Sequence, residues 1–241
     1  MHALTPTGLL KVWEQGEGQH PIDRALTLLA VACPEKNLSD LAHLNIGQRD
    51  TLLFRFRQLN FGSRMDSYAE CPKCGAELES SMDIEKLLSS QTSADAGERS
   101  AAFDGFVIRY HLPNSIDLAE CFKSGIPSSL SLLENCVSGV TGEVESKSVR
   151  ELPQEVTSSL VSLMSEQDPF SDVKISMQCN QCGHQFSALL DILSFVWKEL
   201  TQKVGRLLQE VYILAVNFGW SERDILSMNS SRRKIYLDMV A

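Results

Sequence analysis

Two short turns with the same pattern of cysteines constrain the fold of this 241-residue chain more than any other feature. Residues 71–75 read Cys-Pro-Lys-Cys-Gly, and residues 179–183 read Cys-Asn-Gln-Cys-Gly. Two thiolates separated by two residues can bind one metal ion when the backbone between them turns tightly. Glycine after the second cysteine permits a positive φ angle and lets backbone amides approach the sulfur. Each turn therefore supplies half of a tetrahedral metal site.

The two turns lie in copies of one short sequence unit. When Cys71 is aligned with Cys179, five positions of the segment 71–84 are identical without a gap. They are Cys71/Cys179, Cys74/Cys182, Gly75/Gly183, Asp83/Asp191 and Ile84/Ile192. Apolar residues coincide as well, Leu78 with Phe186 and Met82 with Leu190. The similarity indicates that both copies form the same small hairpin.

We expect Cys71, Cys74, Cys179 and Cys182 to bind one structural zinc ion. Four thiolates form a closed tetrahedral shell with Zn–S bonds of ~2.3 Å. The two motifs of such a site are usually separated by about 15–20 residues, whereas more than a hundred residues separate them here. The spacing predicts a split zinc ribbon, in which the zinc ties the N-terminal and C-terminal helical regions together across an insertion.

The sequence leaves three alternatives open for these cysteines. The turns could be separate half-sites that a second subunit completes. They could be redox pairs, although redox Cys-x-x-Cys motifs usually open a helix and both turns here continue into strand-like sequence. His184 could replace one cysteine, but its counterpart in the repeat, Ala76, cannot bind a metal. We expect Cys33, Cys121 and Cys136, on apolar helix faces, to be buried small hydrophobic residues.

Composition favours a folded protein in a reducing compartment. Hydrophobic residues make up 43% of the chain, which is enough for a core. The sequence has no secretory signal pattern and no run of about 18 apolar residues. Seven cysteines, an odd number, favour metal-bound thiols over disulfides. We expect a cytoplasmic protein without membrane contact.

The charge of the chain argues against binding to nucleic acid. The net charge is −9 and the estimated pI is 5.1. An acidic surface repels the phosphate backbone, and nucleic-acid affinity depends largely on basic residues that contact phosphates. The basic residues 232–234 near the C-terminus are more typical of a solvated helix face.

The period of the apolar residues predicts an α+β fold that is mostly helical. The expected regions are residues 1–62 (N-terminal helices), 63–88 (first zinc-knuckle hairpin), 101–167 (inserted mixed α/β segment), 168–193 (second zinc-knuckle hairpin) and 194–241 (C-terminal helices). Pro21 is placed to begin a helix and Pro34 to end it. A further helix is expected from Ile46 to Asn60, with Leu52, Leu53, Phe56 and Leu59 on its apolar face and a stop at Gly62.

The inserted segment has weaker signals. Residues 106–110 read as a strand, Ser115 as the cap of a helix, and residues 129–136 as another short helix. Residues 139–148 and the small polar residues 89–97 read as loops or linkers. Pro153 is expected to open a helix with Leu160 on its apolar face.

Motifs of known catalytic sites are missing from the sequence. It contains no G-x-x-x-x-G-K-[ST], no G-x-G-x-x-G after a strand, no H-E-x-x-H and no G-x-S-x-G. The five histidines do not pair at a useful spacing. A catalytic zinc keeps an open position, whereas four cysteines fill the shell. We therefore expect no enzyme. An active site in the inserted segment is the alternative, and it predicts a deep pocket with titratable groups of perturbed pKa.

Segments spread over nearly the whole chain resemble the baseplate hub assembly protein family of T-even phages. Such proteins are encoded beside contractile-tail genes in tailed phages and in phage-tail-like injection systems. The supporting segments are residues 44–50, 71–74, 112–118, 168–169, 179–184, 191–192, 218–226 and 232–237. One departure is Asn180, where such proteins often carry proline. This change alters the turn only slightly and leaves both thiols in place.

The resemblance implies a non-enzymatic assembly factor, such as a chaperone that leaves, or a minor structural component of the baseplate hub. Its partners are then hub, spike or tube proteins, and the protein can become part of a tail or injection particle. A different reading is a zinc-ribbon adaptor or regulator that contacts nucleic acid or the transcription machinery. Only Lys73 is basic within the two turns, and this disfavours the second reading.

Overall fold

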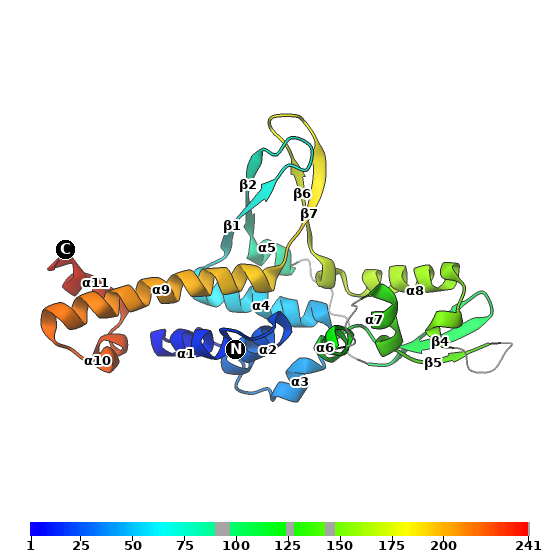
Figure 1. The fold of residues 1–241 in the computed structure, drawn as a ribbon, viewed down its shortest axis with the longest axis horizontal. Coiled ribbons are helices and arrows are strands. Elements are labelled where there is room, and N and C mark those ends of the chain that lie inside the picture. Colours follow the sequence, from blue (N-terminus) through cyan, green and yellow to red (C-terminus); the bar gives the residue numbers. More distant parts are fainter. Residues whose placement is uncertain (90–96, 124–127, 143–147, 241) are drawn as a thin grey trace.

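The computed structural model describes residues 1–89, 97–123, 128–142 and 148–240. The described residues are mostly helical and form three small antiparallel sheets. Figure 1 shows an elongated molecule in which the long helix α9 (Ile192–Phe218) lies along the helical body, two hairpins project from its middle, and the inserted segment lies at the end opposite the C-terminus. The expectation of a mostly helical α+β chain is confirmed.

Helices α1 (Pro6–Gly16), α2 (Pro21–Ala32), α3 (Leu38–Ala42) and α4 (Ile46–Phe61) form the N-terminal part of the body. Local sequence sets their ends. Pro21 is the first residue of α2, where its missing N–H costs nothing, and Gly62 ends α4 with φ 93°. Asn45 and Gln48 form a reciprocal capping box at the start of α4. Helix α3 was not predicted from the sequence.

The predicted apolar face of α4 is wrong in one respect. Leu53 and Phe56 are fully buried as expected, but Leu59 is 48% exposed and Phe54 is fully buried instead. Helix α4 contacts α2 and α9 and also the short 3-10 helix η2 (Pro169–Asp172). The extra contact arises because Phe170 of η2 packs edge-on against Phe54. A segment more than a hundred residues away thus decides which side of α4 is buried.

The body is completed by α9 (Ile192–Phe218), α10 (Glu222–Ser227) and α11 (Ser230–Asp238). Buried residues recur along α9 at helical spacing, from Ile192 to Leu214. Gly219 ends α9 in the left-handed conformation, and the Ser221 side chain caps α10. Of the basic residues 232–234, Arg232 and Lys234 are exposed as expected, but Arg233 is buried. Its guanidinium bonds to Glu210 on α9 at 2.9 Å and also donates to the carbonyl oxygen of Met228.

The inserted segment has its own cluster of buried residues. Strands β3 (Arg99–Phe103), β4 (Phe106–Tyr110) and β5 (Val137–Thr141) form an antiparallel sheet in the order β3-β4-β5. Helices α6 (Ser115–Lys123), α7 (Ser129–Cys136) and α8 (Gln154–Gln167) and the 3-10 helix η1 (Val149–Glu151) accompany it. The buried cluster lies between these elements and includes Ile108, Tyr110, Leu133, Cys136 and Leu160.

Two sequence predictions for this segment need correction, and one strand was missed. Residues 139–141, expected as loop, belong to β5, because they pair with β4. Strand β3 was not predicted. The cap of α6 is Asn114 rather than Ser115, since the Asn114 amide oxygen accepts from the N–H groups of Ile116 and Asp117. Residues 90–96 and 143–147, expected as linker and loop, lie outside the described residues.

Candidate metal centre

The two copies of the sequence repeat form two hairpins of the same design. Strand β1 (Arg64–Glu70) pairs with β2 (Glu77–Asp83), and β6 (Lys174–Gln178) pairs with β7 (Gln185–Leu189), both antiparallel. The pairs next to the turns are Glu70↔Glu77 and Gln178↔Gln185. Because these positions correspond in the repeat, each turn places its two cysteines in the same way.

The backbone of the two turns is also the same. In the first, the N–H of Gly75 donates to the Cys71 carbonyl at 2.9 Å, and the N–H of Cys71 donates to the Ala76 carbonyl at 2.9 Å. The second turn repeats both bonds, from Gly183 to Cys179 at 2.9 Å and from Cys179 to His184 at 2.8 Å. The two glycines have φ angles of 73° and 70°. Residues with a side chain rarely adopt these angles, which explains glycine at both positions.

The tips of the two hairpins meet, and their four sulfur atoms converge. All four lie within 4.8 Å of one another. The Cys71 and Cys182 sulfurs are 3.7 Å apart, and those of Cys74 and Cys179 are 3.5 Å apart. A tetrahedral ion with Zn–S bonds of ~2.3 Å holds its sulfur ligands about 3.8 Å apart. The sulfurs are too far apart for disulfides, whose bond is about 2.05 Å. The spacing fits a four-coordinate zinc.

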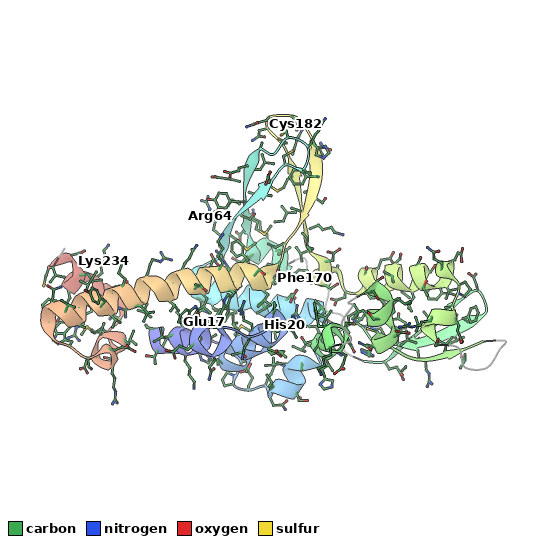
Figure 2. All side chains as sticks on the ribbon, viewed as in Figure 1. Glu17, His20, Arg64, Phe170, Cys182 and Lys234 are labelled. Atoms are coloured by element: carbon green, nitrogen blue, oxygen red, sulfur yellow. The ribbon has the colours of Figure 1, made fainter. Side chains whose placement is uncertain are left out.

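The Cys71–Cys182 and Cys74–Cys179 pairs each join one hairpin to the other. Cys71 and Cys179 are almost fully buried, Cys182 is half-buried, and Cys74 is exposed. Beneath the sulfurs lies a small apolar cluster that includes Ala76, Leu78, Met177 and Phe186. Figure 2 places Cys182 at the tip of the hairpins, well away from the helical body. The cysteines therefore lie where the apolar core is smallest.

The pKa values of two of the four thiols are shifted in opposite directions. The backbone N–H of Cys182 is the main cause of lowering the pKa of the Cys179 thiol to about 6. At Cys74 the backbone N–H of Ala76 lowers the pKa, but hydrogen bonds with the Cys182, Cys179 and Cys71 sulfurs, together with burial, raise the pKa to about 12. Four crowded sulfurs cannot all carry negative charge without a cation, and a coordinated metal deprotonates its thiols outright.

The other candidate residues are outside this cluster. The ring of His184 stacks on Phe186, with ring centroids 6.1 Å apart, and His184 is not among the four converging ligands. Cys33, Cys121 and Cys136 are buried, as expected. Both turns converge within one chain, so no second subunit is needed to bring four thiols together.

The repeat continues past the hairpins into the helical body. Ile84 begins helix α5 (Ile84–Ser89), and its counterpart Ile192 begins α9. The preceding aspartates accept backbone N–H bonds at these helix starts, Asp83 from Glu85 and Asp191 from Ser194. Both isoleucines are buried in the main core. The repeat thus specifies a hairpin together with its attachment to the body.

The sequence analysis missed a second group of potential ligands. His111, Asp117 and Cys136 in the inserted segment place their ligand atoms within 4.8 Å of one another. His111 and Asp117 form a direct contact at 3.0 Å. The spacing between histidines does not indicate this group. The signal in the sequence is a histidine, His111, followed six positions later by an aspartate, Asp117, in the first turn of a helix.

Comparisons with known proteins give one match. The family model described as T4 bacteriophage base plate protein matches residues 8–197. Searches of curated proteins and of solved structures give no match. Among the described residues, no helix is both long and apolar enough to cross a membrane. The matched range includes both cysteine turns and most of the chain, so the chain belongs to the T4 bacteriophage base plate protein family.

Proposed function

We propose that this protein is a zinc-stabilised assembly factor or minor structural component of the baseplate hub in a contractile tail or injection system, and that it is not an enzyme. The observation that carries the proposal is the family match over residues 8–197. Its partners are other baseplate proteins, namely hub, spike or tube subunits. The protein is incorporated into, or acts on, the tail particle.

One structural zinc ion bound by Cys71, Cys74, Cys179 and Cys182 is the second part of the proposal. It is supported by the convergence of the four sulfurs and by the fit of their separations to a tetrahedral ion. The site is then a split zinc ribbon with the inserted segment between its halves. Since thiolates fill all four positions, the ion has no open site for substrate and only holds the two hairpin tips together.

Exposed apolar side chains on α9 support a protein partner. Tyr212 and Val216 are 68% and 67% exposed, and Leu208 precedes them by one turn on the same face. Trp220, in contrast, stacks on Phe218 with centroids 4.5 Å apart and contacts Tyr236, so its main role is internal packing. We define Leu208, Tyr212 and Val216 as the α9 stripe. Such a stripe is typical of a surface that another protein covers.

Co-purification from cells that produce the particle tests the proposed role. The tagged protein should retain hub, spike or tube subunits, and a deletion should leave particles without a complete baseplate. Complete, sheathed particles from the deletion strain would contradict the proposal.

A surface variant tests whether the α9 stripe is the contact surface, independently of whether the protein has the proposed assembly role. Tyr212→Asp with Val216→Asp should abolish co-purification while zinc content and folding remain unchanged. Leu38→Asp is the matched control, because Leu38 is 56% exposed on α3 at another part of the surface. Undiminished co-purification of the double variant would place the contact elsewhere.

A further inference from the structure

We propose a second metal site in the inserted segment, where His111, Asp117 and Cys136 bind a zinc-like divalent ion with one coordination position open. Three different elements supply the ligands. His111 follows β4, Asp117 lies in the first turn of α6, and Cys136 is the last residue of α7. Their ligand atoms lie within 4.8 Å of one another. The site shares no residue with the four-cysteine cluster and does not depend on the proposed baseplate role.

Backbone contacts hold the three ligands in place before any ion binds. The N–H of His111 donates to the Cys136 carbonyl at 3.0 Å. One oxygen of Asp117 accepts from the N–H of Asn114 at 2.9 Å and lies 3.0 Å from the Nε2 atom of His111. The Asn135 side chain donates to the Asp117 carbonyl at 3.0 Å. A site held by its surroundings in this way loses little entropy when it binds an ion.

The ligand types and their separations suit zinc. Imidazole nitrogen, carboxylate oxygen and thiolate sulfur bind Zn²⁺ at about 2.0–2.3 Å, which places neighbouring ligand atoms roughly 3.3–3.7 Å apart. The His111–Asp117 contact is 3.0 Å, and no pair in the group exceeds 4.8 Å. Small side-chain rotations are enough to close the shell around an ion.

Burial and charge favour a cation at this place. Cys136 is fully buried and Asp117 is 6% exposed. A divalent ion bound here would neutralise the buried carboxylate of Asp117 and stabilise a thiolate at Cys136.

Two of the three ligands, His111 and Asp117, line a cleft of about 470 Å³. The cleft is also lined by Asn45, Asn114 and Glu98. The Nδ2 atom of Asn45 is buried and has no hydrogen-bond partner among the described residues. Three protein ligands leave the fourth position of a tetrahedral ion for a water or another ligand.

A simpler reading makes the same residues a structural contact. His111 and Asp117 then form only a hydrogen-bonded pair at the start of α6, and Cys136 is only a buried thiol. The two readings differ in zinc stoichiometry. With both sites filled the full-length chain holds about two zinc ions, whereas the simpler reading allows about one.

Zinc titration of the full-length protein, followed by metal analysis after gel filtration, distinguishes these readings. The wild type should hold about two ions per chain, and His111→Ala should hold about one. His43→Ala is the matched control, since His43 lines the same cleft but is outside the ligand group, and it should keep both ions. Two ions in His111→Ala, or a single wild-type ion that His111→Ala retains, would overturn the proposal.

A second readout covers variants that fold poorly. The Cys71→Ser/Cys179→Ser protein should still bind about one zinc, with a rise in its melting temperature when zinc is added. Adding Cys136→Ala should remove that rise. Cobalt substitution of the Cys71→Ser/Cys179→Ser protein should give a thiolate-to-cobalt absorption band that Cys136→Ala abolishes. A band that persists without Cys136 would assign the thiolate elsewhere and refute the site.

Discussion

The hairpin tips and the helical body differ in how much apolar core they bury. Around the four cysteines the buried residues are few, namely Cys71, Ala76, Leu78 and Cys179. The body has a large continuous core from α1, α2, α4, α9 and neighbouring elements. A two-stranded hairpin is marginally stable by itself, whereas a bound metal contributes folding free energy directly. If the proposed zinc is bound, it would stabilise the projecting strands as the apolar core stabilises the packed helices.

Removal of the proposed zinc ligands should have the largest local effect. Structural zinc contributes an apparent binding free energy of about 10–16 kcal/mol in small domains. In Cys71→Ser/Cys179→Ser we therefore expect loss of zinc from this cluster and fast amide hydrogen exchange throughout β1, β2, β6 and β7, together with lower solubility. Amides of α4 and α9 should remain protected.

The control for that experiment is a buried cysteine of the body. Cys33→Ala should keep the hairpin zinc, because Cys33 packs in the main core. Slow exchange of the hairpin amides in the double-serine protein would show that the two parts are not stabilised differently.

A cavity in the body should destabilise the helical body rather than the hairpins. Phe54 is fully buried in α4, and Phe54→Ala should lower the free energy of unfolding by about 3–5 kcal/mol. Urea denaturation of the zinc-bound protein measures this. The exposed residue Leu59 on the same helix provides the control, since Leu59→Ala should cost less than about 1 kcal/mol. Equal costs would mean that η2 does not cover α4 as described.

Acidification should stabilise the helical body through Asp50 but destabilise the zinc-bound hairpins. Burial raises the pKa of Asp50 in α4 from 3.8 to about 6, despite its ion pair with Arg49. The folded state then binds a proton more tightly than the unfolded state, so this group stabilises the fold at low pH and that stability is lost as pH rises through about 4 to 6. The effect is on the order of 3 kcal/mol. Zinc thiolates, in contrast, protonate and release metal as pH falls.

Urea denaturation of wild type and Asp50→Asn at several pH values tests this. The difference in unfolding free energy between the two proteins should change between pH 4 and 6.5, in favour of the variant at the higher pH. A difference that is flat over this range would contradict a raised pKa at Asp50.

Alanine at the turn glycines should have the smallest effect, and an equal one in both hairpins. Gly75 and Gly183 have φ angles of 73° and 70°, so each substitution should cost about 1–2 kcal/mol. Gly205→Ala in α9 is the control. No atom lies within 4 Å of a Cβ added there, and alanine should stabilise the helix by about 0.5–1 kcal/mol. Competition with a zinc chelator measures the effect at the turns, and unequal costs would mean that the two turns are not equivalent.

Local sequence was sufficient for several features of this protein. Pro21, Gly62, Gly219 and Ser221 mark helix ends because the responsible contacts span only a few residues. The repeat around Cys71 and Cys179 was recognisable for the same reason, since each turn specifies its own geometry. Zinc binding by the four cysteines remains a prediction, as do the proposed region boundaries.

The tertiary structure decided what depends on distant residues. Phe54 is covered by Phe170 of η2, and the buried Arg233 pairs with Glu210 on α9. The pairing of β3 and β5 with β4 and the approach of Cys136 to His111 and Asp117 are likewise long-range. Cysteine turns, prolines and glycines determine the backbone conformation of their own segment, so their effects can be predicted from the sequence. Burial and clustering depend on which surfaces meet, which only the folded chain determines.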